Sequence, residues 1–338
     1  MSIKSYERER CSPFTHKKYY CWGDSMINEH KHEAVLNTLG INKKTLIGFG
    51  MEAFVYKYDE QRVLKIYNSD MTSASKQHTL KNFYNVLDIS NVNIELPQIE
   101  QIMEINGTIV TIEKLINGRN MREAIENSPE EKIEKLMKNH LLALLKTRDV
   151  NIQGAFKGIK LFHEADVPES NDWYQYLHNL LHYQLSKVEP YLQEYVERFN
   201  EKVDALFRAL SGDYTGKYTL IHGDFCPENI LVNSNCEVTG IIDFGLMTMQ
   251  GDFLFDVATG WLFFDMYDQY TFDFKTKYLN LVIKTFGEKV KSKIFLYVLL
   301  YSIYSVNFYS DDFSDGHADW CIRNLNDQNL WKEVEFDN

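Results

Sequence analysis

The segment 218–244 constrains the fold more than any other part of this chain, because polar residues interrupt short apolar runs within a region that otherwise has helical spacing. Two apolar runs flank the sequence HGDFCPEN at 222–229, and a third, 238–244, follows the turn NSN at 233–235. Short apolar runs separated by turn residues predict strands. We therefore expect a mainly helical domain that carries a small β insert with polar residues in its loops.

The polar residues of this insert suit a site for a cation and a hydroxyl group. Asp224 follows a strand, Asn229 comes five residues later, and Asp243 stands at the end of a neighbouring strand, so the three side chains can converge. Amide and carboxylate oxygens are ligands of hard cations such as Mg²⁺. Asn229 and Asp243 are therefore candidate metal ligands. Asp224 remains available to meet a hydroxyl, which is the arrangement used in phosphoryl transfer.

The region before this insert has the pattern of a small antiparallel sheet. Four apolar runs predict strands at 53–58, 62–67, 99–105 and 108–115. The last two are separated by Asn106-Gly107, the strongest short signal for a hairpin turn. A helical pattern at 74–87 lies between the second and third strands. The sequence predicts a sheet with one inserted helix.

Two features of this sheet point to phosphate binding. Gly48 and Gly50 form a glycine-containing turn before the first strand, where backbone N–H groups could face phosphates. Lys65 lies in the middle of the second strand, between aliphatic neighbours. By itself such a lysine more often faces water on an edge strand. The downstream Asp and Asn residues favour the phosphate-binding interpretation.

The chain divides into three parts by pattern. Residues 1–44 form an extension with a helix at 28–39, residues 45–116 hold the sheet, and residues 117–338 hold the helices. Gly118 marks the hinge between the last two. Helical spacing covers 129–147, 173–210 and 253–310. With 338 residues, 44% of them apolar, both lobes have enough material for a core.

The motif HGDFCPENILVN…VTGIIDFG resembles the catalytic segment of the aminoglycoside phosphotransferase family. These are small-molecule kinases with the eukaryotic-like protein kinase fold. IEKL at 112–115 with Gly118-Arg119, and GD at 251–252 with Asp256, are similar to further family motifs, so the resemblance covers about residues 45–310. It implies a two-lobed α+β kinase-like fold, with a small antiparallel N-lobe and a larger helical C-lobe carrying the β insert.

The resemblance also implies roles for individual residues. Asp224 would be the catalytic residue, and Asn229 and Asp243 would hold Mg²⁺. ATP or GTP would be the co-substrate. The implied nucleotide-binding residues are Gly48, Gly50, Lys65, and the backbone groups of Glu113 and Leu115 against the purine. His222 and Asp256 would support the catalytic loop and take no part in the chemistry.

One feature departs from the family pattern. Kinases of this fold usually pair the strand lysine with a Glu on the following helix, but 74–87 contains no Glu. Asp70 and Asp88 stand at the edges of that segment. The partner of Lys65 is left open: phosphate alone, or Asp70.

The charge distribution bears on the acceptor. Residues 1–116 have no net charge, whereas 117–338 carry the whole net charge of −12. An acidic chain cannot neutralise phosphates, which argues against nucleic-acid binding. Carboxylates in the C-terminal part suit a cationic, hydroxyl-rich acceptor such as an aminoglycoside, or they form a solvated surface. The candidate acceptor-binding residues are Asp265, Asp268, Asp312 and Asp315.

Three functions remain open. The first is a small-molecule kinase of the antibiotic-resistance type. The second is a metabolite kinase with a choline-, methylthioribose- or homoserine-like acceptor, and the third is a non-catalytic nucleotide-binding protein of the same fold. A protein kinase is disfavoured, because Asp243 and Asp256 leave no room for an activation segment. The sequence does not give the oligomeric state.

The remaining signals concern location. Five cysteines without a CxxC pair indicate reduced thiols in a cytoplasm. The start of the chain, MSIKSYERERCS, is charged where a signal peptide would be apolar. The longest uncharged run, 294–310, contains four Tyr and three Ser, which favours a buried helix over a membrane span.

Overall fold

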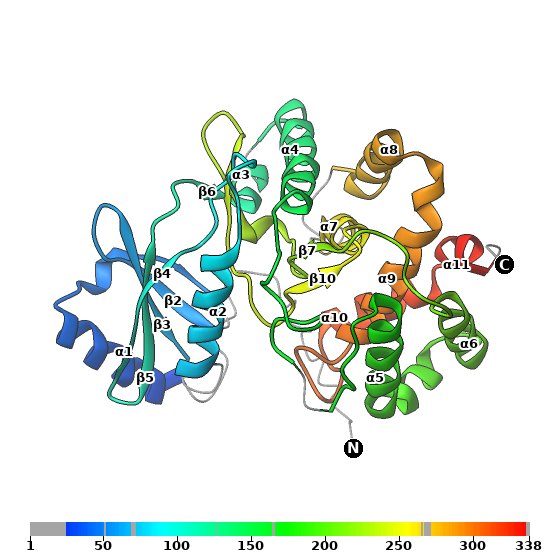
Figure 1. The fold of residues 1–338 in the computed structure, drawn as a ribbon, viewed down its shortest axis with the longest axis horizontal. Coiled ribbons are helices and arrows are strands. Elements are labelled where there is room, and N and C mark those ends of the chain that lie inside the picture. The colour runs from blue at the N-terminus through cyan, green and yellow to red at the C-terminus, as the bar shows by residue number, and fades with distance from the viewer. Residues whose placement is uncertain are drawn as a thin grey trace, which may run out of the picture.

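A computed structural model describes residues 25–50, 52–68, 72–126, 128–163, 166–264, 266 and 272–335. Figure 1 shows two lobes, a smaller one built on a twisted sheet and a larger helical one. The helical lobe encloses short strands near the junction between the lobes. The predicted α+β organisation in two lobes is confirmed.

The N-lobe holds one antiparallel sheet of five strands in the order β1-β2-β3-β5-β4. The strands are β1 (Leu46–Phe49), β2 (Ala53–Lys57), β3 (Arg62–Tyr67), β4 (Ile99–Ile105) and β5 (Thr108–Lys114). The β4–β5 turn has positive φ at both Asn106 and Gly107, as the dipeptide predicts. In the β3–β5 pair, Lys65 lies opposite Thr111 and Val63 lies opposite Glu113.

The two faces of this sheet have different coverings. Leu64, Ile66 and Ile112 form one buried cluster with Val35 and Leu36 of α1 (Ser25–Leu39). A short 3₁₀ helix, η1 (Lys43–Thr45), connects α1 to β1. Because side chains alternate along a strand, the neighbours of Leu64 and Ile112 face the opposite side, where α2 (Ala74–Val86) lies. The helix predicted at 28–39 is thus present, and it covers one face of the sheet.

The C-lobe contains the β insert near its junction with the N-lobe. Its first sheet pairs β7 (Thr219–Ile221) with β10 (Met249–Gly251), and its second has the order β6-β8-β9. These three strands are β6 (Arg119–Asn120), β8 (Ile230–Val232) and β9 (Val238–Ile241). The 3₁₀ helix η2 (Pro227–Asn229) precedes β8. The strands around the motif were predicted, whereas β6 and β10 were not.

The remaining C-lobe elements are helical, and several of them pack against α9 (Lys291–Ser305), which is almost entirely buried. The others are α3 (Met121–Glu126), α4 (Glu130–Arg148), α5 (Trp173–Tyr195), α6 (Phe199–Ala209), α7 (Leu254–Phe264), α8 (Phe274–Phe286), η3 (Glu288–Val290), α10 (Gly316–Asn326) and α11 (Gln328–Glu335). The uncharged run from residue 294 is therefore mostly a core helix. Among the described residues, the helices are all too short or too polar to cross a membrane.

The helical spacing predicted at 173–210 is divided between two helices. The first ends at Tyr195, and Arg198, before the second, adopts a left-handed φ of 53°. The side chain of Asn326, from the distant α10, donates to the Tyr195 carbonyl at 2.9 Å and accepts the Glu197 N–H at 3.0 Å. These bonds satisfy backbone groups that a continuous helix would pair internally. A tertiary contact therefore ends α5 where the local sequence has no breaker.

Candidate active site

The loop 222–226, which carries Asp224 and is called the catalytic loop after the role expected from sequence, begins directly after β7 and depends on one glycine. Gly223 has a φ of +80°, in the left-handed region that favours glycine. A Cβ at this position would lie 2.1 Å from the carbonyl oxygen of Met247. Only glycine lets the loop approach the 247 backbone so closely. The position of the next residue, Asp224, follows from this approach.

Asp256 holds the same loop from the other side. Its carboxylate, in the first turn of α7, accepts the N–H groups of His222 at 2.7 Å and Gly223 at 2.8 Å. Burial raises the pKa of Asp256 to about 7, although these two N–H groups oppose the shift. The contacts are those of a support beneath the loop.

His222 connects the loop to the strand that leads to Asp243. Its Nδ1 atom accepts the N–H of Asp224 at 3.2 Å, so Nε2 carries the proton and donates to the Ile242 carbonyl at 2.8 Å. Burial lowers the pKa of His222 to about 4. The ring is therefore neutral at physiological pH, with both nitrogens occupied by backbone groups. This arrangement suits a structural role.

Asp224 is oriented by Asn229. The Asn229 side-chain N–H₂ group donates to the Asp224 carboxylate at 3.0 Å and to the Asp224 backbone carbonyl at 2.9 Å. Burial raises the pKa of Asp224 to about 6, and the nearby Glu228 carboxylate adds to the shift. The backbone carbonyl of Asn229 also accepts the N–H of Ile242 at 3.0 Å. These bonds connect the catalytic loop to the strand before Asp243.

Asp243 lies where the two lobes meet. It adopts a left-handed φ of 62°, a strained conformation for a non-glycine residue that often marks functional sites. Its side chain is 56% exposed, and its carboxylate accepts a hydrogen bond from Lys65 Nζ at 3.0 Å. The positive charge of Lys65 lowers the pKa of Asp243. A solvent-facing, ionised carboxylate at this point is a suitable ligand for a cation.

Lys65 has a second carboxylate partner, on the sheet itself. Its Nζ lies 3.5 Å from Glu113 of β5, which is buried. Burial alone would lower the pKa of Lys65, but Asp243 and Glu113 together raise it well above its usual value. Of the two acids considered from sequence, Asp70 lies outside the described residues, and Asp88 accepts the N–H of Ser90. The sequence did not reveal Glu113 as the partner.

The donor atoms present fit a magnesium site. With its N–H₂ group bonded to Asp224, Asn229 can offer its amide oxygen, and Asp243 offers a carboxylate. No cluster of three or more His, Cys, Asp or Glu side chains that could hold a metal is found in the described part of the chain. Mg²⁺ does not require one, because it is usually held by one or two protein oxygens together with water and phosphate.

All five predicted nucleotide contacts, Gly48, Gly50, Lys65, Glu113 and Leu115, remain predictions. Gly48 belongs to β1, and the N–H of Gly50 donates to the Ala53 carbonyl at 3.0 Å across the turn. The N–H of Leu115 donates to the Gln61 carbonyl at 2.7 Å. A purine that bonded this N–H would have to displace that contact.

Two of the four candidate acceptor residues have local structural explanations. Asp315 caps α10 by accepting the N–H groups of His317 and Ala318 at 2.8 and 2.9 Å. Asp312 accepts hydrogen bonds from Ser310 and from the N–H of Ser314. The other two candidates, Asp265 and Asp268, lie outside the described residues.

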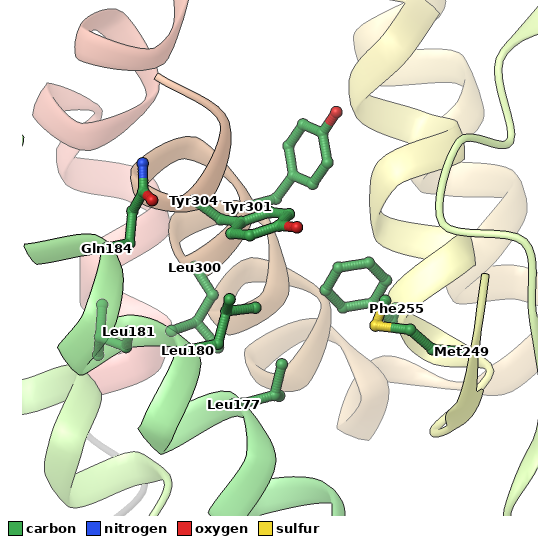
Figure 2. Close-up of a pocket in the computed structure, with 9 residues that line it drawn as sticks. All are labelled: Leu177, Leu180, Leu181, Gln184, Met249, Phe255, Leu300, Tyr301 and Tyr304. Carbon is green, nitrogen blue, oxygen red and sulfur yellow. The ribbon is translucent and has the colours of Figure 1, made fainter. Parts of the chain in front are cut away.

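An apolar cavity that sequence reasoning missed lies between α5, α9 and the start of α7. Figure 2 shows the leucines of α5 opposite Phe255 and the side chains of α9. The lining residues are Leu177, Leu180, Leu181, Gln184, Met249, Phe255, Leu300, Tyr301 and Tyr304. Its volume is about 20 Å³, enough for one small group. The periodicity of a single element does not predict it, because four elements (α5, β10, α7 and α9) contribute.

The chain is similar to a known protein family. The model of a family described as the phosphotransferase enzyme family matches residues 53–279, which include both Lys65 and the catalytic segment. This match covers more than half of the chain.

Solved structures show the same fold. A thermostable mutant of aminoglycoside phosphotransferase APH(4)-Ia, in a ternary complex with AMP-PNP and hygromycin B, matches with a TM-score of 0.58 and 16% identity, covering 86% of this chain and 97% of that chain. The gentamicin–APH(2")-IIa complex gives 0.54 and 19%, covering 92% and 98%. The GDP complex of wild-type aminoglycoside 2'-phosphotransferase-IIIa gives 0.56 and 18%, covering 90% and 98%. The predicted protein-kinase-like fold is confirmed.

Proposed function

The chain belongs to the phosphotransferase enzyme family, and on that premise we propose that it transfers the γ-phosphate of ATP or GTP to a hydroxyl of a small-molecule acceptor. One observation carries the proposal. Asp224 and Asn229 of the catalytic loop lie 3.0 Å apart, and Lys65 of the N-lobe lies 3.0 Å from Asp243 of the C-lobe. The four residues proposed to carry phosphoryl transfer are thus hydrogen-bonded in two pairs, one within the C-lobe and one across the two lobes.

Asp224 is proposed to orient the acceptor hydroxyl and to take its proton. A carboxylate with a pKa of about 6 is largely ionised at neutral pH and still basic enough to accept a proton. The Asn229 N–H₂ group keeps the carboxylate in one orientation. Because the transferred phosphoryl group passes through a loose transition state, such positioning supplies much of the rate.

Asn229 and Asp243 are proposed to hold Mg²⁺, and Lys65 to contact the α- and β-phosphates. When bound, the cation would neutralise charge on the phosphates. The structures that resemble this chain contain AMP-PNP or GDP, which supports a nucleotide co-substrate but leaves ATP and GTP as alternatives. Lys65 presents its ammonium group between the lobes, next to Asp243.

The acceptor is proposed to be cationic and rich in hydroxyl groups, as aminoglycoside antibiotics are. The net charge of −12 confined to residues 117–338 supports this class, because a negative field concentrates cationic ligands. Two of the similar structures contain hygromycin B and gentamicin. Asp265, Asp268, Asp312 and Asp315 remain the proposed contacts. The activity would then be of the antibiotic-resistance type.

The test is release of nucleoside diphosphate from Mg-ATP and Mg-GTP in the presence of a panel of acceptors. The panel contains aminoglycosides, hygromycin B, macrolides, choline and methylthioribose. The catalytic variant is Asp224→Asn, and the matched control is Asp213→Asn, an exposed acid. We expect one cationic antibiotic to stimulate release in the wild type and in the control but not in Asp224→Asn. Stimulation only by choline or methylthioribose would replace the antibiotic assignment with a metabolite kinase, and no stimulation by any acceptor would contradict a kinase of these classes.

A further inference from the structure

The position of Lys65 raises a question that the proposed function does not answer. A lysine that contacts phosphates must be held in one place, and in the fold family to which this chain is similar an acid on the helix after the strand usually does this. Helix α2 supplies no acid at all, since its sequence is ASKQHTLKNFYNV. Its buried Gln77 is neutral and bonds Thr72 and Tyr67.

The β3–β5 register places a different acid beside the lysine. Lys65 lies opposite Thr111, and Glu113 is two residues further along β5. Residues two apart on a strand share a face, so Glu113 is the diagonal neighbour of Lys65, within reach of long side chains. The observed distance of 3.5 Å between Lys65 Nζ and Glu113 agrees with this placement.

Glu113 is built into the sheet with its own supports. The residue is 4% exposed, and a buried carboxylate is costly unless it is paired and hydrogen-bonded. Thr111 donates its hydroxyl to Glu113 at 2.7 Å, and the hydroxyl of Tyr67 lies 3.4 Å away. These two groups and Lys65 fix the carboxylate. A buried acid held this way is a rigid anchor for a lysine.

We propose that Glu113 is the positioning residue for the phosphate-contacting Lys65, so that the anchor of this lysine has moved from helix α2 to strand β5. The proposal rests on the proposed nucleotide-binding role of Lys65. Because β3 and β5 are hydrogen-bonded neighbours, the lysine stays in place whatever the position of α2. The Glu113 side chain does not touch the nucleotide; it acts through Lys65.

A double-mutant cycle tests the proposal, with the dissociation constant of a fluorescent ATP analogue as the readout. We expect Glu113→Gln and Lys65→Ala each to weaken binding about tenfold, and the double variant to bind no more than about twofold more weakly than Lys65→Ala alone. Glu113→Asp keeps the charge and should recover part of the affinity. Glu100→Gln is the matched control, because Glu100 is an exposed acid on β4 that pairs with Arg62.

Failure of the Glu113 proposal can be told apart from failure of the proposed function. The Glu113 proposal would be overturned if Glu113→Gln weakened binding equally in the wild-type and Lys65→Ala backgrounds. It would also be overturned if Glu113→Gln bound within about twofold of the wild type. If Glu113→Gln does not fold, Thr111→Val removes the orienting hydroxyl and should weaken binding about twofold to threefold, only when Lys65 is present. Absence of binding by the wild-type protein would refute the proposed function itself.

Discussion

Replacing Gly223 by alanine tests whether the backbone geometry of the catalytic loop sets the rate. The left-handed φ of +80° costs alanine about 1–2 kcal/mol. A Cβ would also lie 2.1 Å from the Met247 carbonyl oxygen, where ordinary contacts are 3.4 Å or longer. The loop must therefore shift by on the order of 1 Å. A displacement of that size next to Asp224 is expected to lower kcat by about 100-fold.

Gly245→Ala is the matched control. Gly245 has no positive φ, and no atom lies within 4 Å of a Cβ built on it. Its N–H bond to Thr248 does not depend on the side chain. We expect kcat to change by less than about threefold in this variant.

Steady-state kinetics with an active acceptor provide the assay, together with nucleotide affinity and thermal unfolding. We expect Gly223→Ala to lose kcat while nucleotide affinity changes by less than about threefold, because the proposed phosphate contact, Lys65, lies on a different lobe. Full activity in Gly223→Ala would refute the argument from loop geometry. An equal loss in Gly245→Ala would show that any added methyl group in this region is harmful.

Three further predictions concern pH and stability. Because burial raises the pKa of Asp224 to about 6, kcat/KM should fall as the pH drops through 6, and a flat rate profile from pH 5 to 8 would contradict this. The raised pKa also means that ionised Asp224 destabilises the folded state at high pH, so Asp224→Asn should raise the melting temperature more at pH 8 than at pH 5. Tyr297→Phe leaves the buried Trp173 indole N–H without its 3.0 Å partner and should lower the free energy of unfolding by about 1–3 kcal/mol in urea titrations, whereas Tyr195→Phe, at an exposed position, should have little effect. Leu36→Ala should cost about 2–5 kcal/mol in the same titrations if α1 is part of the N-lobe core, and a cost below about 1 kcal/mol would show that α1 is dispensable.

Local patterns predicted the parts of the fold whose causes are local. Asn106-Gly107 predicted its hairpin because both residues tolerate a positive φ, and both adopt one. The spacing of Asp224 and Asn229 follows from one loop and one short helix, so the sequence places them together without any tertiary information. Their carboxylate and amide groups then predicted a site for a cation and a hydroxyl.

Contacts between residues far apart in the sequence determine the partner of Lys65 and the end of α5, which local patterns did not predict. Glu113 becomes the neighbour of Lys65 only through the β3–β5 register, which a search of the helix after the strand could not find. The break after Tyr195 depends on Asn326, more than a hundred residues away. Asp315 is a different case, since an Asp directly before a helix is a common N-cap and its capping role could have been predicted.

The most direct test of the central claim is transfer of labelled γ-phosphate from Mg-ATP or Mg-GTP to an acceptor, with the product isolated and its phosphate ester identified. We expect label on a hydroxyl of a cationic acceptor with the wild-type protein and none above background with Asp224→Asn. Label transferred equally well by Asp224→Asn, or label found only in inorganic phosphate with every acceptor, would contradict it.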